Sequence, residues 1–109
     1  MELYNKLESI LPFKDTLKGS LIGIEKEGLR VSEDGTIAQT PHPEGLGSAL
    51  KNPAITTDFS EALLELVTPP LVGADKVIDE LTTIHDYVYK SLQKNERFWP
   101  ASMPCIVRG

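Results

Sequence analysis

Residues 23–31, GIEKEGLRV, place two glutamates one residue apart in a stretch that alternates like a β-strand. Side chains at positions i and i+2 of a strand lie on the same face, about 7 Å apart. Glu25 and Glu27 therefore project together, and Lys26 between them points to the opposite face. Two ionised carboxylates at that distance repel each other, and a cation between them would reverse the sign of the interaction.

The residues around this stretch predict a hairpin and then a loop. The alternation over 20–31 favours a strand, and Asp34-Gly35 is a strong turn signal before the apolar pair Ile37 and Ala38. Residues 40–53 contain three prolines and two glycines, so we expect a loop there, with one helical turn over 44–50.

A second apolar run, ALLELV at 62–67, fits a strand or a helix by periodicity alone. We favour a strand over 62–68, because β-branched residues cluster at its end and two prolines follow directly. Glu65 then shares a face with Leu63, Val67 and Glu61. A glutamate on a largely apolar face is costly unless it is paired or bound to a metal.

Two stretches have the apolar spacing of amphipathic helices. The first covers 2–12 and is expected to end at Pro12. The second is a long helix over 74–95, which neither glycine nor proline interrupts. Its apolar positions are Val77, Ile78, Leu81, Ile84, Val88 and Leu92. The expected helices and antiparallel strands together predict the α+β class.

Length and composition limit the functional classes. The chain has 109 residues, so 1–109 forms one small domain or part of a larger one; the unlike ends favour the N-terminal fragment of a longer protein. A net charge of −5 argues against a nucleic-acid partner, and no apolar stretch is long enough to span a membrane. The only cysteine, Cys105, cannot form an internal disulfide, which fits a cytoplasmic protein.

Four acids stand out as candidate ligands: Glu25, Glu27, Asp58 and Glu65. With no cysteine or histidine among them they form a hard oxygen set, which suits Mg²⁺ or Mn²⁺ and, with it, phosphate chemistry. The alternative, a solvated acidic face without a ligand, stays open at this point. The sequence assigns no catalytic residue.

The remaining polar and aromatic candidates favour structural roles. His42 lies in the loop and is expected to pack or cap, and His85 is expected on the exposed side of the long helix. Cys105 is expected to be a buried structural thiol, and Phe98 and Trp99 are expected in the core.

Four segments, in this order, resemble the N-terminal part of bacterial glutamate–cysteine ligases. They are GIEKEGLRV, DGTIAQTPHPEGLGSAL, ITTDFSEALLELVTPP and ERFWPASMPC, and they span about residues 20 to 105. The resemblance implies part of a curved antiparallel sheet like that of glutamine synthetase, with flanking helices. The family's enzymes are several times longer, which agrees with a fragment.

The resemblance also implies a chemistry and a site. The family joins L-glutamate and L-cysteine at the expense of ATP through an acyl phosphate, giving γ-glutamylcysteine, the first step of glutathione biosynthesis. Glu25 and Glu27 would hold Mg²⁺ (or Mn²⁺) against the ATP phosphates, helped by Glu65 or Asp58. Phe59 matches a family position near the cysteine pocket.

Further consequences follow from the part of the family pattern that this chain lacks. Other metal ligands, the substrate-binding arginine and most nucleotide contacts would lie beyond residue 109, so the chain alone should be inactive. An incomplete sheet leaves an open edge, so we expect the isolated chain to self-associate. Two alternatives stay open: a non-catalytic metal- or nucleotide-binding module derived from such a ligase, and a plain structural α+β domain.

Overall fold

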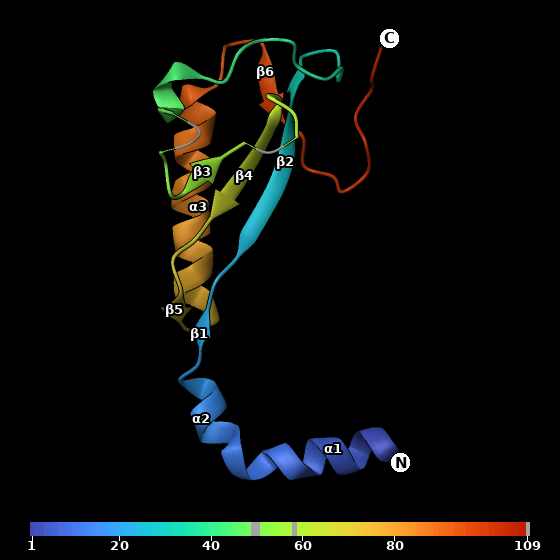
Figure 1. The fold of residues 1–109 in the computed structure, drawn as a ribbon, viewed down its shortest axis with the longest axis vertical. Coiled ribbons are helices and arrows are strands. Elements are labelled where there is room, and N and C mark those ends of the chain that lie inside the picture. Colours follow the sequence, from blue (N-terminus) through green and yellow to red (C-terminus); the bar gives the residue numbers. More distant parts are fainter. Residues whose placement is uncertain (49–50, 58, 109) are drawn as a thin grey trace.

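The computed structural model describes residues 1–48, 51–57 and 59–108, and it has the expected α+β architecture of helices and antiparallel strands (Figure 1). The helical elements are α1 (Glu2–Ile10), the 3₁₀ turn η1 (Leu11–Phe13), α2 (Lys14–Lys18), the 3₁₀ turn η2 (Glu44–Leu46) and α3 (Ala74–Ser91). The strands are β1 (Leu21–Ile22), β2 (Glu25–Ser32), β3 (Ile55–Thr56), β4 (Leu63–Val67), β5 (Leu71–Val72) and β6 (Glu96–Phe98). Among the described residues, no helix combines the length and apolar character needed to cross a membrane.

The main sheet has four antiparallel strands in the order β3-β4-β2-β6. β2 is the longest strand and joins the two halves, because its first five residues pair with β4 and its last three with β6. β1 and β5 form a separate two-stranded ribbon. β2 therefore fixes the register of the whole main sheet.

The core lies between one face of the main sheet and α3, which runs along that face (Figure 1). Leu64 and Leu66 of β4 are fully buried, and Ile84 and Val88 of α3 pack against the same cluster. The transfer of each large apolar side chain from water contributes about 1.5–3 kcal/mol. The periodic apolar positions of the long helix thus produce the predicted packing, although α3 ends at Ser91 rather than at residue 95.

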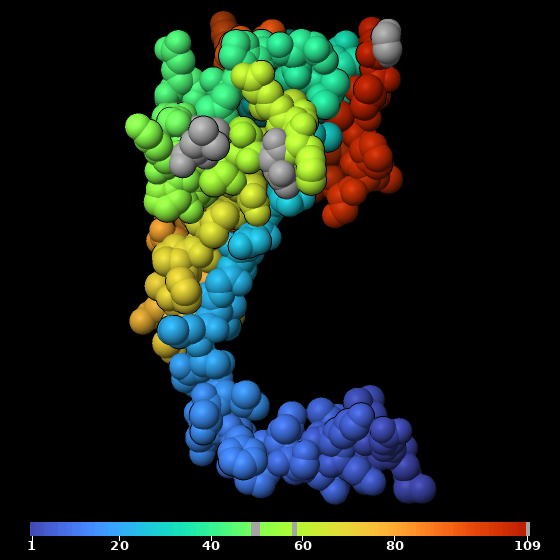
Figure 2. Space-filling view, viewed as in Figure 1, coloured from blue at the N-terminus to red at the C-terminus, as the bar shows by residue number. Residues whose placement is uncertain are grey.

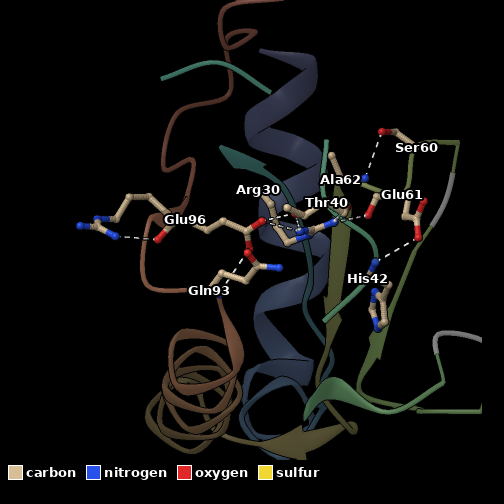
Figure 3. A network of polar contacts seen from close by, with 9 residues as sticks. Arg30, Thr40, His42, Ser60, Glu61, Ala62, Gln93 and Glu96 are labelled. Atoms are coloured by element: carbon tan, nitrogen blue, oxygen red, sulfur yellow. Dashed lines mark hydrogen bonds and ion pairs between the residues drawn. The ribbon is translucent and has the colours of Figure 1, made fainter. Parts of the chain in front are cut away.

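A buried polar network closes the end of the sheet that carries β6 (Figure 3). Arg30 of β2 is fully buried and forms an ion pair with Glu96 of β6, at 3.0 Å. Arg30 also donates to the hydroxyl and carbonyl oxygens of Thr40 and to the carbonyl oxygen of Glu61. The Thr40 hydroxyl donates in turn to Glu96. One guanidinium thereby links β2, β6, the 40–43 loop and the segment before β4.

Several sequence predictions about the strands and turns are confirmed. β4 lies inside the predicted strand 62–68, and the predicted strand 20–31 is present as β1 and β2 with a break between them. Gly35 has a φ of 81°, as the predicted turn requires, but the returning chain forms isolated bridges rather than a strand: one between Val31 and Ile37, and a parallel one between Thr36 and Ile106. The helical turn expected over 44–50 is η2, and positions 49–50 lie outside the described residues.

The first α-helix ends at Ile10, two residues before Pro12 and close to the predicted end, but the helical conformation does not stop there. The chain stays helical through η1 and α2 to Lys18, with Pro12 in the first turn of η1. A proline is tolerated at such a position because the amide it lacks would have no intrahelical partner there. Residues 2–18 form an arm that projects away from the sheet, and every residue of the arm is exposed (Figure 1).

The buried ion pair gives the first testable prediction. Arg30→Met leaves the Glu96 carboxylate buried without its counter-charge, so it should lower the free energy of unfolding by about 3–5 kcal/mol. Arg30→Met/Glu96→Gln should cost clearly less than the two single substitutions added together. Urea unfolding followed by circular dichroism measures both. Lys6→Met, which breaks the exposed pair with Glu2, is the control and should have no measurable effect; additive costs at Arg30 and Glu96 would contradict the prediction.

Candidate functional site

The predicted acids of β2 and β4 lie on one face of the main sheet. Glu27 is directly opposite Glu65, and Glu25 is directly opposite Val67. Residues directly opposite in an antiparallel pair project to the same side. The core residues of β4 project to the other side, toward α3. Glu25, Glu27 and Glu65 therefore share the face that α3 does not cover, which we call the acid face.

The closest pairing on the acid face is between two like charges. Cβ atoms of directly opposite residues are about 4.5–5.5 Å apart, and like charges in this position destabilise a sheet. Glu65 is half-buried, and the Thr56 hydroxyl of β3 donates to its Oε2 at 3.1 Å. Glu25 and Glu27 are exposed. The acid face thus carries unbalanced negative charge at the centre of the sheet.

The acid face has the ligand chemistry of a magnesium site but is not a closed metal site. Carboxylates from two strands supply hard oxygen ligands, which Mg²⁺ and Mn²⁺ prefer. Within 1–48, 51–57 and 59–108, no three histidine, cysteine, aspartate or glutamate side chains converge as they would around a bound ion. Asp58, the fourth predicted ligand, lies outside the described residues. The donor set therefore fits the expected ion, and these side chains would have to turn toward it.

A hollow of about 410 Å³ adjoins the acid face at Glu27. Its walls come from β2, from Leu63 of β4 and from the segment 99–104. Trp99 is half-buried in this wall, where its indole N–H donates to the carbonyl oxygen of Met103. The prediction that Trp99 belongs to the core is therefore wrong, whereas Phe98 and Cys105 are buried as predicted.

The opposite face of β2 is held by a cluster of Lys26, His85 and Phe98. The Lys26 ammonium lies 2.8 Å from Nε2 of His85 and 5.5 Å from the centre of the Phe98 ring. The His85 ring meets the Phe98 ring edge-on at 5.5 Å. Gly28 lets the ring approach the strand, because a Cβ at this position would lie 2.4 Å from Phe98. This cluster sits behind the acid face and packs β2 against α3.

The expectation that His85 is exposed is wrong. His85 is half-buried between α3 and the sheet, and burial followed by the Lys26 charge lowers its pKa. The sequence did hold a signal for this placement: His85 lies four residues after Leu81 and three before Val88, within the apolar stripe of α3. A histidine in such a stripe packs like an apolar residue when it is neutral.

The other predicted residues do not join this cluster. His42 packs in its loop as expected; its backbone N–H donates to the Glu61 carboxylate, and burial followed by the Arg30 charge lowers its pKa. The Phe59 side chain is fully exposed. Neither Arg30 nor Glu96 was singled out from the sequence, because their pairing joins strands 66 positions apart.

Comparison with known proteins gives a consistent picture. The profile of a family described as Glutamate-cysteine ligase matches residues 8–109. A glutamate–cysteine ligase of Pseudomonas entomophila is 54% identical over 107 residues, which is 97% of this chain and 20% of that protein. One from Alcanivorax borkumensis is 55% identical over 92 residues, 84% of this chain and 17% of that protein.

Solved structures show the same relationship. The chain is similar to a glutamate–cysteine ligase of Francisella tularensis in complex with AMP, with a TM-score of 0.80 and 42% identity over 83% of this chain and 18% of that one. It is also similar to a bifunctional glutathione synthetase of Pasteurella multocida, with a TM-score of 0.78 and 39% identity over 86% of this chain and 13% of that one. The chain thus spans about a fifth or less of the length of these relatives.

The two histidines give a prediction about pH. Their pKa values are lowered from about 6.5, so between the folded and unfolded pKa values the unfolded chain binds more protons. The free energy of unfolding should therefore fall as the pH drops below about 6.5 and through the lowered pKa values of the two histidines, and these residues should add no slope at higher pH. His85→Gln should make this dependence shallower, as should His42→Gln. Urea unfolding at several pH values measures it; a full slope in both variants would contradict the assignment.

Proposed function

Because this chain belongs to the glutamate–cysteine ligase family, we propose that its acid face forms part of the Mg²⁺–ATP site of such a ligase. The observation that carries the proposal is the direct pairing of Glu27 with Glu65 on the uncovered face of the sheet. A protein gains no stability from two opposed carboxylates. A divalent cation bound between them would convert this repulsion into attraction.

The proposed reaction is the ATP-dependent joining of L-glutamate and L-cysteine. The γ-carboxylate of glutamate takes the γ-phosphoryl group of ATP, which gives an acyl phosphate and ADP. The amine of cysteine then attacks the acyl carbon and releases phosphate, leaving γ-glutamylcysteine. The Francisella tularensis relative in complex with AMP supports a nucleotide site in this family.

Residues of β2 and β4 would serve this reaction by holding and orienting the metal ion. Glu25 and Glu27 would hold Mg²⁺, and Glu65 and Asp58 would complete the carboxylate set. The Thr56 hydroxyl bond keeps the Glu65 carboxylate on the acid face. When held by these residues, Mg²⁺ would supply the positive charge that stabilises a phosphoryl group during its transfer. Phe59, exposed just before β4, is free to contact the cysteine substrate.

The remaining parts of this proposal concern the protein as a whole. We assign it to the cytoplasm, where ATP and both amino acids are available. The expected self-association of the isolated chain stays a prediction. A non-catalytic module that binds Mg²⁺ without turnover would use the same acid face, so metal binding alone does not separate it from a ligase.

A metal titration tests the acid face directly. Mn²⁺ should bind saturably to the chain, measured as the loss of the free-ion paramagnetic resonance signal, and Glu25→Gln/Glu27→Gln should weaken this binding at least tenfold. Glu65→Gln should also weaken it. The matched control is Glu2→Gln/Glu8→Gln, which removes the same charge from the arm and should leave binding unchanged. Equal losses in both double variants would mean that only net charge matters, and the proposed site would be wrong.

The isolated chain should not catalyse the ligation. It spans about a fifth of the Pseudomonas entomophila ligase, and two short strands of carboxylates cannot enclose three substrates and exclude water. With ATP, L-glutamate, L-cysteine and Mg²⁺, a coupled assay of ADP release should therefore show no cysteine-dependent rate. That full-length relative is the positive control, and turnover by the chain alone would contradict the prediction.

A further inference from the structure

The arm of residues 2–18 carries an apolar face that stays exposed to solvent in the part of the chain that the structure describes. On a helical wheel that runs through α1 and the first residue of η1, five large side chains fall within one arc of about 120°. These are Leu3, Tyr4, Leu7, Ile10 and Leu11, which are 46% to 74% exposed. We call this set the apolar stripe. Phe13 and Leu17 continue the exposed apolar surface along η1 and α2.

Among residues 1–48, 51–57 and 59–108, no element buries the apolar face of the arm, although this face is suited to packing. The radius of gyration is 18.1 Å, whereas a compact chain of this length has about 13 Å. Figure 2 shows the arm standing clear of the body, on the same side as the C-terminal segment, with an open space between them. An isolated amphipathic helix of nine residues is marginal in water, so most of its stability must come from docking.

The charges of the arm favour a protein surface over a membrane. Lys6, Lys14 and Lys18 are balanced by Glu2, Glu8 and Asp15. Two of these lysines are engaged by acids of the arm itself, in the pairs Lys6–Glu2 and Lys18–Asp15. A helix that binds anionic lipid carries an excess of basic residues on its polar face. A neutral, internally paired polar face suits an arm that lies on a protein and keeps that face in solvent.

We infer that the apolar stripe docks onto the part of the full-length ligase polypeptide that lies outside the region matched by this chain. The match to the Pseudomonas entomophila ligase covers 97% of this chain, so nearly all of the arm belongs to the shared region. About four-fifths of that protein has no counterpart here. This remaining part of the polypeptide is large enough to cover the apolar stripe. The surface that docks on the stripe is therefore an apolar surface of the same enzyme.

Cysteine labelling tests which surface covers the stripe. A chimera joins residues 1–109 to the unmatched part of the Pseudomonas entomophila ligase. Leu7→Cys reports on the stripe, and Lys6→Cys on the polar face is the matched control. With a maleimide reagent and dilute protein, Leu7→Cys should react at least tenfold more slowly in the chimera than in the isolated chain, while Lys6→Cys should react equally in both.

Other outcomes would overturn the inference. Equal Leu7→Cys rates in the chimera and the isolated chain would mean that the stripe stays exposed. Protection in the isolated chain that grows with concentration, with none added in the chimera, would assign the stripe to a second copy. Protection only by phosphatidylglycerol vesicles would assign it to a membrane. No metal or nucleotide is present, so the result is independent of the proposed Mg²⁺–ATP site.

Hydrogen exchange gives a second measurement without any substitution or chimera. In the natural Pseudomonas entomophila ligase, amides aligned with residues 2–18 should exchange at least tenfold more slowly than those of the arm in the isolated chain, after correction for intrinsic rates. Equal protection in the two proteins would overturn the inference even if the chimera failed to fold.

Discussion

The buried pair of Arg30 and Glu96 is the interaction on which the rest of this structure depends. Taking both charges out of water is costly, and the pair is tolerable because Thr40 and Glu61 satisfy further hydrogen bonds of the guanidinium (Figure 3). The network lies where β2 passes from its pairing with β4 to its pairing with β6. It therefore specifies register: with Arg30 fixed on the core face, every other residue of β2 has a fixed side.

That register gives β2 two faces with different tasks. Lys26 and Gly28 lie on the same face of β2 as Arg30, and the close approach of Phe98 to Gly28 leaves no room for a side chain there. Glu25 and Glu27 point to the uncovered side. A slip of one residue would bury the glutamates and expose the arginine, so the core polar network also determines the position of the acid face.

The sequence predicted features that depend on local periodicity and missed those that depend on distant partners. α3, β4 and the alternation of Glu25, Lys26 and Glu27 follow from patterns within about 20 residues, and all three are confirmed. The partner of Arg30 lies 66 residues away, and no local pattern connects the two. The prediction that His85 is exposed was wrong for a different reason: it followed the polarity of the imidazole and not the position of the residue in the apolar stripe of α3. The hollow beside Glu27 requires the path of segment 99–104, which propensity does not specify.

The acid face is a local conflict within an otherwise consistent sequence. Opposing Glu27 to Glu65 lowers the stability of a small sheet, and such departures from local consistency are expected at functional sites. Contacts on the opposite face of β2 offset this loss of stability. They are the ion pair of Arg30 with Glu96 and the edge-on contact of His85 with Phe98. A ligand that binds only the folded sheet and neutralises the carboxylates would add its binding free energy to the stability of the fold. Metal binding and folding of this sheet are in that case coupled through β2. A substitution of Glu27 would then change both the affinity for the metal and the stability of the sheet.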